Sequence, residues 1–445
     1  MFTRTVIAGN PSFANPIEVR FWEDLKLALE RFGWSLLMHS MRKIDDADDR
    51  MVLPARLKDV ANFLANTPKE LGGKLPPWLS EDMFNMIVDW EHRRWELRDH
   101  NHNIPGGLHK LAWHVDTLVN TVRPAFVMTT NKIDHGCSLF NLTALHYGAQ
   151  YLFVERSPLD SILVEPSGMF AESLLFRDFE PSSTAQYEKA GEAIARDLAS
   201  DAEGFRPQSG LSLEQWSDIT NAPKPLILLP MDNALWTGLA QKGHPQSLVD
   251  YPSDFRDMDG VIRGLAEQIG EYGGTLLLKL HPAEREPMFA ASAAPPPNVI
   301  EVREGLNELM RYVDGCVVLL SKVAFPALAM DIPTAVLSTN TAAAAGKGYV
   351  FSTQAQLTEA IEAICQGGSS SVENDVGDQT FHRFLGWSQR AFYVDVSHPI
   401  DYSRRNILSL AEDMTTRELG APIAPADLGV ESWVEAKQNM RKRQP

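Results

Sequence analysis

Two strand ends in the second half of the sequence carry side chains that could bind a phosphate group. At the first, Lys279 and His281 follow a buried apolar run. Because they are two positions apart in a strand, their side chains share one face of the sheet. Pro282 then takes the chain out of the sheet. A buried strand seldom carries lysine and histidine on one face unless they meet a ligand at its end, so we expect these residues to contact one.

The second strand end is the sequence Leu320-Ser321-Lys322, which leads into a predicted helix. Ser321 is a typical N-cap residue, and Pro326 favours a helix start close to it. The N-terminus of a helix presents free N–H groups and the positive end of the helix dipole, which together attract phosphate. We expect the two strand ends to be neighbours and to hold one nucleotide phosphate jointly. The alternative is that the histidine is a core residue, the lysine an edge charge and the serine only a helix cap.

Four carboxylates are candidates for acid–base chemistry because they follow predicted strands. Glu155 and Asp160 come directly after residues 151–154, Asp134 lies in the loop after the preceding strand, and Asp232 follows residues 226–229. A carboxylate in a cleft between domains could take a proton or stabilise an oxocarbenium-like centre during sugar transfer. For any one of these residues taken alone, the alternative is hydrogen bonding to the nearby backbone in a turn.

Metal-binding patterns in the sequence are weak, and we expect no metal site. The pairs Asp46/Asp48 and Asp257/Asp259 match an Asp-x-Asp pattern, but the first lies in a run of charges and the second at a predicted helix start. Five histidines between residues 92 and 114 have no helical His-Glu-x-x-His motif or cysteine partner. Neither half contains a Walker or Gly-x-Gly-x-x-Gly loop.

The elements that must position these residues alternate between strand and helix. In the first half, apolar runs predict strands at residues 6–10, 35–38, 125–129 and 151–154, with helices at 22–32 and 137–146. In the second half they predict strands at residues 226–229, 275–280, 299–302, 316–320 and 334–337. Helices are predicted at 258–272, 306–312, through residue 328, and at 357–364. This alternation predicts doubly wound sheets whose ligands bind at the carboxyl ends of the strands.

The length of 445 residues exceeds what one hydrophobic core usually supports, so we expect two α/β domains. The first would comprise residues 1–222, up to the linker Asn221-Ala222-Pro223-Lys224-Pro225, and the second residues 223–370. Residues 371–445 would form helices that pack back on the first domain.

The charge and composition of the sequence limit the partners that the protein can bind and the compartment in which it is expected. The formal net charge of −17 disfavours nucleic acid, so a phosphate-bearing ligand needs a local basic or amide-lined pocket. Three scattered cysteines without metal spacing indicate a reducing compartment. The sequence shows no signal-peptide pattern and no apolar run long enough to span a membrane, which predicts a cytoplasmic protein. The basic residues 441–443 could touch an anionic membrane surface, although a solvated tail is the alternative.

The order of several short motifs resembles that of the capsule-polysaccharide biosynthesis glycosyltransferase family, which includes bacterial Kdo transferases. The resemblance covers roughly residues 125–340. Its motifs are Phe153-Val154-Glu155-Arg156-Ser157-Pro158-Leu159, Val164-Glu165-Pro166-Ser167-Gly168, Leu228-Leu229-Pro230-Met231-Asp232, Leu278-Lys279-Leu280-His281-Pro282, and Leu320-Ser321-Lys322-Val323-Ala324-Phe325-Pro326-Ala327-Leu328-Ala329. The His-Pro and serine motifs also look like those with which GT-B sialyltransferases hold the phosphate of a CMP-sugar.

The resemblance implies a GT-B fold, two Rossmann-like domains facing a central cleft, with a CMP-sugar donor (often CMP-Kdo) and no catalytic metal or other cofactor. It implies that His281 and Ser321 contact the donor phosphate and that Lys279 supports them. Many members carry an acidic pair followed by glycine where this chain has Glu155-Arg156-Ser157. We therefore take Glu155 as the first candidate for the catalytic carboxylate, with Asp160 or Asp134 as alternatives.

Together these observations predict a metal-independent glycosyltransferase that moves a sugar to a surface polysaccharide or glycolipid acceptor. A peripheral contact with the cytoplasmic face of the inner membrane or with export machinery would fit that role. Two alternatives share the same fold: a nucleotide-sugar epimerase or hydrolase, and a catalytically inactive module that binds polysaccharide or scaffolds an export complex.

Overall fold

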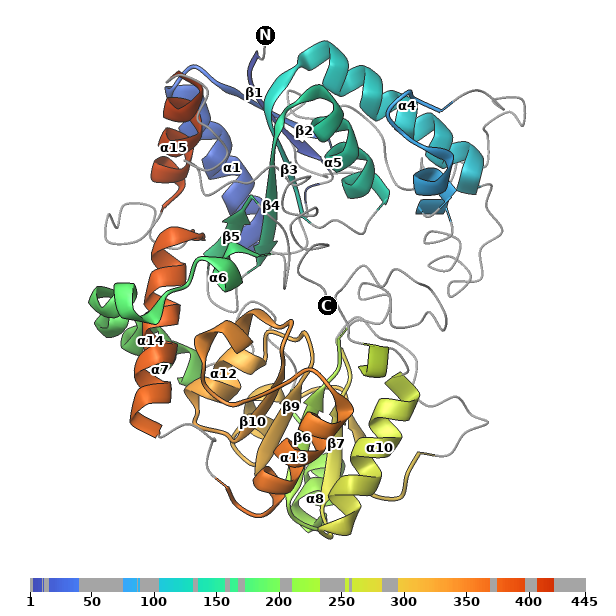
Figure 1. Cartoon of the computed structure of the whole chain (residues 1–445), viewed down its shortest axis with the longest axis vertical. Coiled ribbons are helices and arrows are strands. Elements are labelled where there is room, and N and C mark those ends of the chain that lie inside the picture. The colour runs from blue at the N-terminus through green and yellow to red at the C-terminus, as the bar shows by residue number, and fades with distance from the viewer. Residues whose placement is uncertain are drawn as a thin grey trace. The chain divides into compact units, whose positions relative to one another are not determined.

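The computed structural model describes residues 3–9, 11, 16–39, 75–85, 87–88, 104–130, 135–156, 161–166, 173–200, 210–232, 253–255, 258–281, 295–368, 374–396 and 406–419. The chain forms two compact units (Figure 1). Unit 1 comprises Met1–Arg156, Ser161–Leu174 and Phe392–Pro445, and unit 2 comprises Ser157–Asp160 and Leu175–Ala391. Residues 175–222, which the sequence analysis assigned to the first domain, therefore lie in unit 2, as do residues 371–391.

Unit 1 contains a six-stranded sheet with the order β12-β5-β4-β3-β1-β2. Its strands are β1 (Thr3–Gly9), β2 (Ser35–His39), β3 (Pro124–Thr129), β4 (Gln150–Arg156), β5 (Ser161–Glu165) and β12 (Tyr393–Asp395). The four strands predicted from the sequence, β1 to β4, run parallel. Strands β5 and β12, which were not predicted, add to the edge next to β4 in antiparallel pairings.

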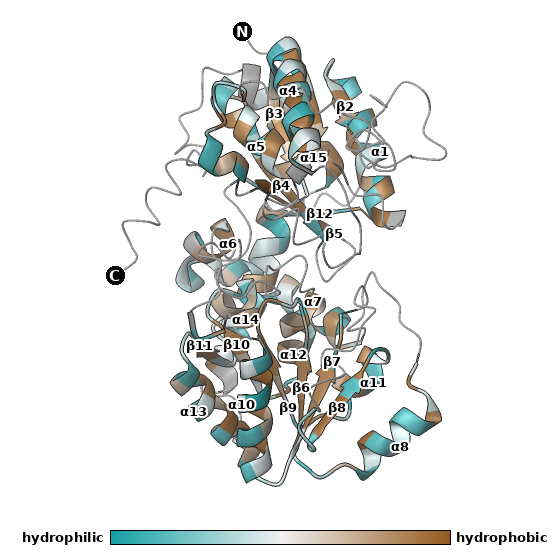
Figure 2. Cartoon of the chain, turned by 90° about the vertical axis from the view of Figure 1, so that its right-hand side faces the viewer, coloured by the Kyte–Doolittle hydropathy of each residue, from teal (hydrophilic) through white to brown (hydrophobic). Residues whose placement is uncertain are grey.

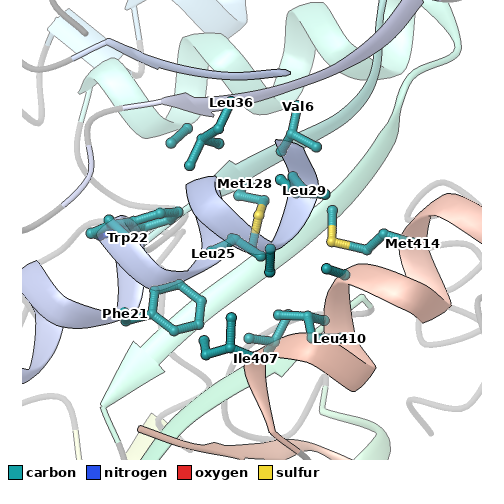
Figure 3. Close-up of a cluster of buried hydrophobic side chains, with 14 of the residues drawn as sticks. Val6, Phe21, Trp22, Leu25, Leu29, Leu36, Met128, Ile407, Leu410 and Met414 are labelled. Carbon is teal, nitrogen blue, oxygen red and sulfur yellow. The ribbon is translucent and has the colours of Figure 1, made fainter. Parts of the chain in front are cut away.

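Helices α1 (Pro16–Arg31), α4 (Ile104–Val122), α5 (His135–Tyr147) and α15 (Ile407–Leu419) also belong to unit 1. Figure 3 shows α1 and α15 sharing one core, in which Trp22 and Leu25 of α1 are buried together with Leu410 of α15. Gly33, at φ 75°, follows the end of α1. Phe32, the last residue of the helix predicted at 22–32, is 36% exposed, and α1 ends one residue before it.

Unit 2 contains a six-stranded parallel sheet with the order β11-β10-β9-β6-β7-β8. Its strands are β6 (Leu226–Pro230), β7 (Thr275–Lys279), β8 (Val299–Val302), β9 (Gly315–Val318), β10 (Thr334–Leu337) and β11 (Tyr349–Phe351). The sequence predicted the first five. Strands β6, β7 and β9 are mostly hydrophobic along their length (Figure 2), and every residue of the three is buried. A central parallel strand is covered on both faces, so it needs apolar residues throughout.

The main helices of unit 2 are α7 (Glu188–Ser200), α8 (Leu213–Asn221), α10 (Met258–Glu271), α11 (Leu306–Met310), α12 (Ala324–Ala329), α13 (Gln354–Cys365) and α14 (Asn374–Ala391). Shorter helical turns are α6 (Leu174–Arg177), which spans the boundary between the units, η2 (Pro181–Tyr187), η3 (Ser253–Phe255) and η4 (Thr341–Ala345). Helix α14 packs closely against α7 and against η2, the turn before α7, because of two glycines. A Cβ atom on Gly191 would lie 1.7 Å from the carbonyl oxygen of His382, and one on Gly386 would lie 2.1 Å from that of Tyr187.

The strand order of unit 2 reverses between β6 and β9. Counted from β6, it is 3-2-1-4-5-6, the order of dinucleotide-binding Rossmann domains. In such sheets, ligands bind beyond the carboxyl ends of the two strands at the reversal. The α/β fold class expected from the sequence, two Rossmann-like units as in GT-B proteins, is confirmed.

Candidate functional site

The chain that leaves β9 is bonded from both sides at the carboxyl edge of the unit 2 sheet. Asp232, which follows β6, accepts a hydrogen bond through Oδ2 from the backbone N–H of Leu320 at 2.9 Å. Asn340, which follows β10, donates from Nδ2 to the carbonyl oxygens of Leu319 and Ser321, at 3.0 and 3.1 Å. Residues 319–321, which we call the β9 loop, are thus held from both neighbouring strands.

Asp232 was a candidate catalytic carboxylate. The structure places it at the strand reversal, as its position after β6 predicts. Its side chain is only 8% exposed, and one carboxylate oxygen is committed to the Leu320 amide. This bond joins two strand ends 88 residues apart in the chain, so it differs from the local turn bond that was the alternative for Asp232.

Lys279 is at the end of β7 and is 3% exposed. Its ammonium group donates to the carbonyl oxygen of Leu280 at 3.0 Å and to that of Arg303, just beyond β8, at 2.6 Å. The lysine therefore ties two strand ends together. His281, two residues later, is partly exposed, while Pro282 lies outside the described residues.

The strand ends that carry His281 and Ser321 are not neighbours, contrary to the sequence-based expectation. Strand β6 lies between β7 and β9, because the order reverses at this point. With a strand spacing of about 4.8 Å, the two strand ends are about 10 Å apart. A ligand that contacts both residues must reach across the end of β6, where Asp232 is located.

Ser321 does not cap the helix that follows it, which corrects a second expectation. Helix α12 starts at Ala324, its N-cap residue is Val323, and no side chain caps it. The Ser321 hydroxyl accepts a hydrogen bond from the backbone N–H of Val323 at 3.4 Å instead, forming a local turn. Helix α12 is only six residues long, which is less than two turns. Ser321 and Lys322 are both partly exposed.

Glu155 lies near the end of β4 in unit 1, in register with Leu163 of β5, and is partly buried. Burial, with the nearby carboxylates of Glu155 and Glu165, raises the pKa of Tyr393 well above its ordinary value. Asp134 and Asp160, the alternatives to Glu155, lie outside the described residues. The structure thus gives a position for one of these three carboxylates, Glu155.

Two residues that the sequence analysis passed over are conspicuous at strand ends. Asn340 is 1% exposed, and its position after an apolar strand was the available signal. His39, at the end of β2, is 1% exposed, and neither of its ring nitrogens has a hydrogen-bonding partner. Its ring lies 5.3 Å from that of His114. Burial, together with His114, lowers the pKa of His39 to about 4, so the imidazole is neutral at pH 7.

Within the described part of the chain, no three histidine, cysteine, aspartate or glutamate side chains are grouped as a metal site requires. Asp259 pairs with Arg263 at 3.1 Å, while Asp46, Asp48 and Asp257 lie outside the described residues. In the same part of the chain, no helix is both long and apolar enough to cross a bilayer.

A cavity of about 720 Å³ opens at the other edge of the unit 2 sheet. Its lining includes Pro225 and Pro333, which precede β6 and β10, so it belongs to the amino ends of the strands. The buried Lys347 in its wall is paired with Asp331 at 2.5 Å and Asp378 at 2.6 Å. None of the candidate residues lies in this cavity.

No family model and no curated protein matches this sequence. Among solved structures, the chain is similar to Thermosulfurimonas dismutans KpsC, a β-Kdo 2,4 transferase, at 15% identity and a TM-score of 0.40, over 66% of this chain and 87% of that one. Methanocaldococcus jannaschii UDP-GlcNAc 2-epimerase in complex with UDP-GlcNAc and UDP shares 10% identity at a TM-score of 0.34, over 84% and 97%. The glycosyltransferase SnogD from Streptomyces nogalater shares 15% identity at a TM-score of 0.27, over 82% of this chain and 95% of that one. These values are too low to assign an activity.

Proposed function

We propose that this protein is a glycosyltransferase that binds a nucleotide-activated sugar at the carboxyl edge of the unit 2 sheet. The observation that carries the proposal is the reversal of strand order between β6 and β9, the place where Rossmann-like sheets bind nucleotides. The motifs that contain Asp232, His281 and Ser321 place these residues beyond the carboxyl ends of β6, β7 and β9, at this edge. These three motifs are among those that resemble the capsule-polysaccharide family.

The finer proposal follows that resemblance. The donor is a CMP-sugar carrying Kdo or a related acidic sugar, and the acceptor is a surface polysaccharide or glycolipid. His281, Ser321 and Lys322 contact the donor phosphate, while Lys279 shapes the backbone from which His281 emerges. Glu155 of unit 1 is the proposed proton acceptor, and the reaction needs no metal. A location of the enzyme at the cytoplasmic face of the inner membrane fits these substrates.

Nucleotide binding is the first test. A thermal-shift screen with CMP, UDP and GDP, each at several concentrations, should show the largest rise in melting temperature with CMP, because a ligand that binds the folded state stabilises it by mass action. AMP is the matched control for a nonspecific effect of a nucleotide. No shift with any nucleotide would contradict the proposal.

Release of CMP from CMP-Kdo, measured with and without a polysaccharide acceptor, then separates the activities. A transferase releases CMP only with the acceptor. Release without an acceptor would identify a hydrolase or epimerase, and binding without turnover an inactive module. Either result would overturn the transferase assignment while leaving the nucleotide site in place.

A further inference from the structure

The β9 loop is held by side chains along its whole length. Each of its three residues has a backbone polar group bonded to Asp232 or Asn340: the carbonyl of Leu319, the N–H of Leu320 and the carbonyl of Ser321. The two side chains approach from the strands that flank β9, one from β6 and one from β10. Two buried polar groups thus set the backbone conformation of a loop that carries a candidate ligand contact.

The Asn340 side chain and the backbone next to Asp232 are themselves hydrogen-bonded. Asn340 accepts a hydrogen bond through Oδ1 from the N–H of Ala342 at 2.9 Å, and its own N–H donates to the carbonyl of Leu337 at 2.8 Å. Asp232 follows Met231, whose N–H donates to the carbonyl of Lys279 at 2.8 Å. At 8% and 1% exposure, neither Asp232 nor Asn340 is well placed to exchange its loop partner for water. A buried group that loses its partner is costly, which favours one loop conformation.

We propose that Asp232 and Asn340 are positioning residues for the nucleotide: they hold the β9 loop in the conformation that presents Ser321 to the donor phosphate. This role rests on the proposed function. It also gives Asp232 a task other than that of a catalytic carboxylate. A positioning aspartate needs an acceptor oxygen, whereas a catalytic base needs an ionisable group, and asparagine supplies the first without the second.

The opposite edge of the same sheet provides matched controls. Asp314 accepts a hydrogen bond through Oδ2 from the N–H of Leu226 at 2.9 Å, so it joins β6 and β9 at their amino ends as Asp232 does at their carboxyl ends. Asn298 donates from Nδ2 to two carbonyls, those of Ala266 at 2.7 Å and Gly274 at 3.3 Å. Their loss should lower stability by the same mechanism without reaching the β9 loop.

The experiment measures CMP affinity by isothermal titration in the full chain, with far-UV circular dichroism to confirm folding. Asp232→Ala should weaken CMP binding at least tenfold, whereas Asp232→Asn should stay within about threefold of wild type, since it keeps an acceptor for Leu320. Asn340→Asp should bind at least as weakly as Asn340→Ala, because a carboxylate cannot donate and would face two carbonyl oxygens. Asp314→Ala and Asn298→Ala should melt earlier but bind CMP as wild type does.

Hydrogen exchange supplies a second readout that needs no ligand. Peptides covering residues 319–322 should exchange faster in Asp232→Ala and Asn340→Ala than in wild type, and at the wild-type rate in Asp314→Ala. If Asp232→Ala does not fold, the comparison of Asp232→Asn with Asn340→Asp in both assays still decides the matter. The positioning role would be overturned if these peptides exchanged faster in Asp232→Asn than in wild type, and as fast as they do in Asn340→Asp.

The remaining outcomes separate this inference from the proposed function. Wild-type CMP affinity in both Asp232→Ala and Asn340→Ala would overturn the inference and leave the glycosyltransferase proposal standing. If the Asp232→Asn variant bound CMP normally but lost all turnover, Asp232 would be a catalytic carboxylate, and the inference would be overturned as well. If Asp314→Ala and Asn298→Ala lost as much CMP affinity, the loss in the Asp232 and Asn340 variants would be due to general destabilisation, and the inference would be overturned. Failure of the wild-type protein to bind CMP, UDP or GDP would overturn both proposals.

Discussion

Arg156 Nε lies 2.9 Å from Oε1 of Glu18, which joins the end of β4 to the first turn of α1 within unit 1. The glutamate side chain is only 9% exposed and the arginine 21%. Arg156 stands in the motif where many members of the resembled family carry an acidic residue. In this chain the residue at that position forms a buried ion pair with Glu18. An acidic residue there would repel Glu18 instead.

Arg156→Ala should lower the free energy of unfolding of unit 1 by about 2 kcal/mol, since it leaves the Glu18 carboxylate buried without this partner. Urea unfolding would measure the loss. The double variant with Glu18→Gln should lose less than the sum of the two single variants. Arg263→Ala, which breaks the exposed pair with Asp259, is the control and should cost at most about 0.5 kcal/mol. Equal losses in Arg156→Ala and Arg263→Ala would contradict this interpretation of the motif.

His39 should make the protein sensitive to mild acid. Its pKa is about 4 in the folded state against an ordinary value of 6.5, so between these values the unfolded chain binds a proton that the folded chain does not. Stability is therefore lost as pH falls from about 6.5 to 4, by at most about 3 kcal/mol. His39→Leu removes this linkage, so its melting temperature should fall less than that of wild type between pH 7 and pH 5. Parallel pH profiles for the two proteins would show that His39 is not responsible.

His281→Ala should leave the fold intact and weaken nucleotide binding or turnover at least tenfold, since a charge-assisted contact to phosphate contributes about 1.5–3 kcal/mol. Titration with CMP and steady-state kinetics would measure both quantities. His382→Ala is a matched control, because this histidine is also partly exposed but lies on α14 of the same unit. Unchanged affinity and rate in folded His281→Ala would remove His281 from the donor site.

Transfer should continue in excess EDTA if the protein alone offsets the charge on the leaving nucleotide. The measurement is CMP release with acceptor present, before and after chelation. Complete loss of activity that magnesium or manganese restores would mean that an acidic pair dismissed in the sequence, Asp46/Asp48 or Asp257/Asp259, takes part in catalysis.

The sequence by itself predicted five of the six strands of unit 2 and several of its helices. Strands β6 to β10 are short apolar runs, and helices α10 and α13 each place apolar residues on one buried face, for example Leu265 and Ile361. Such patterns depend on neighbours a few positions away, so they can be read locally. The same reasoning located the strand ends at which Asp232, Lys279, His281 and Ser321 occur.

Only the tertiary structure decided what those residues contact. The insertion of β6 between β7 and β9 is a matter of strand order, which local patterns do not encode, and it separated His281 from Ser321. The three-residue β12 pairs with β5, from which it is separated by about half of the chain, a long-range contact with no local signature. Ser321 has the residue type of a helix cap, yet helix α12 starts later, at Ala324, and Ser321 belongs to a loop that is bonded to Asp232 and Asn340. Residue type limits which hydrogen bonds a side chain can form, but the packing of distant segments determines which partner is within reach.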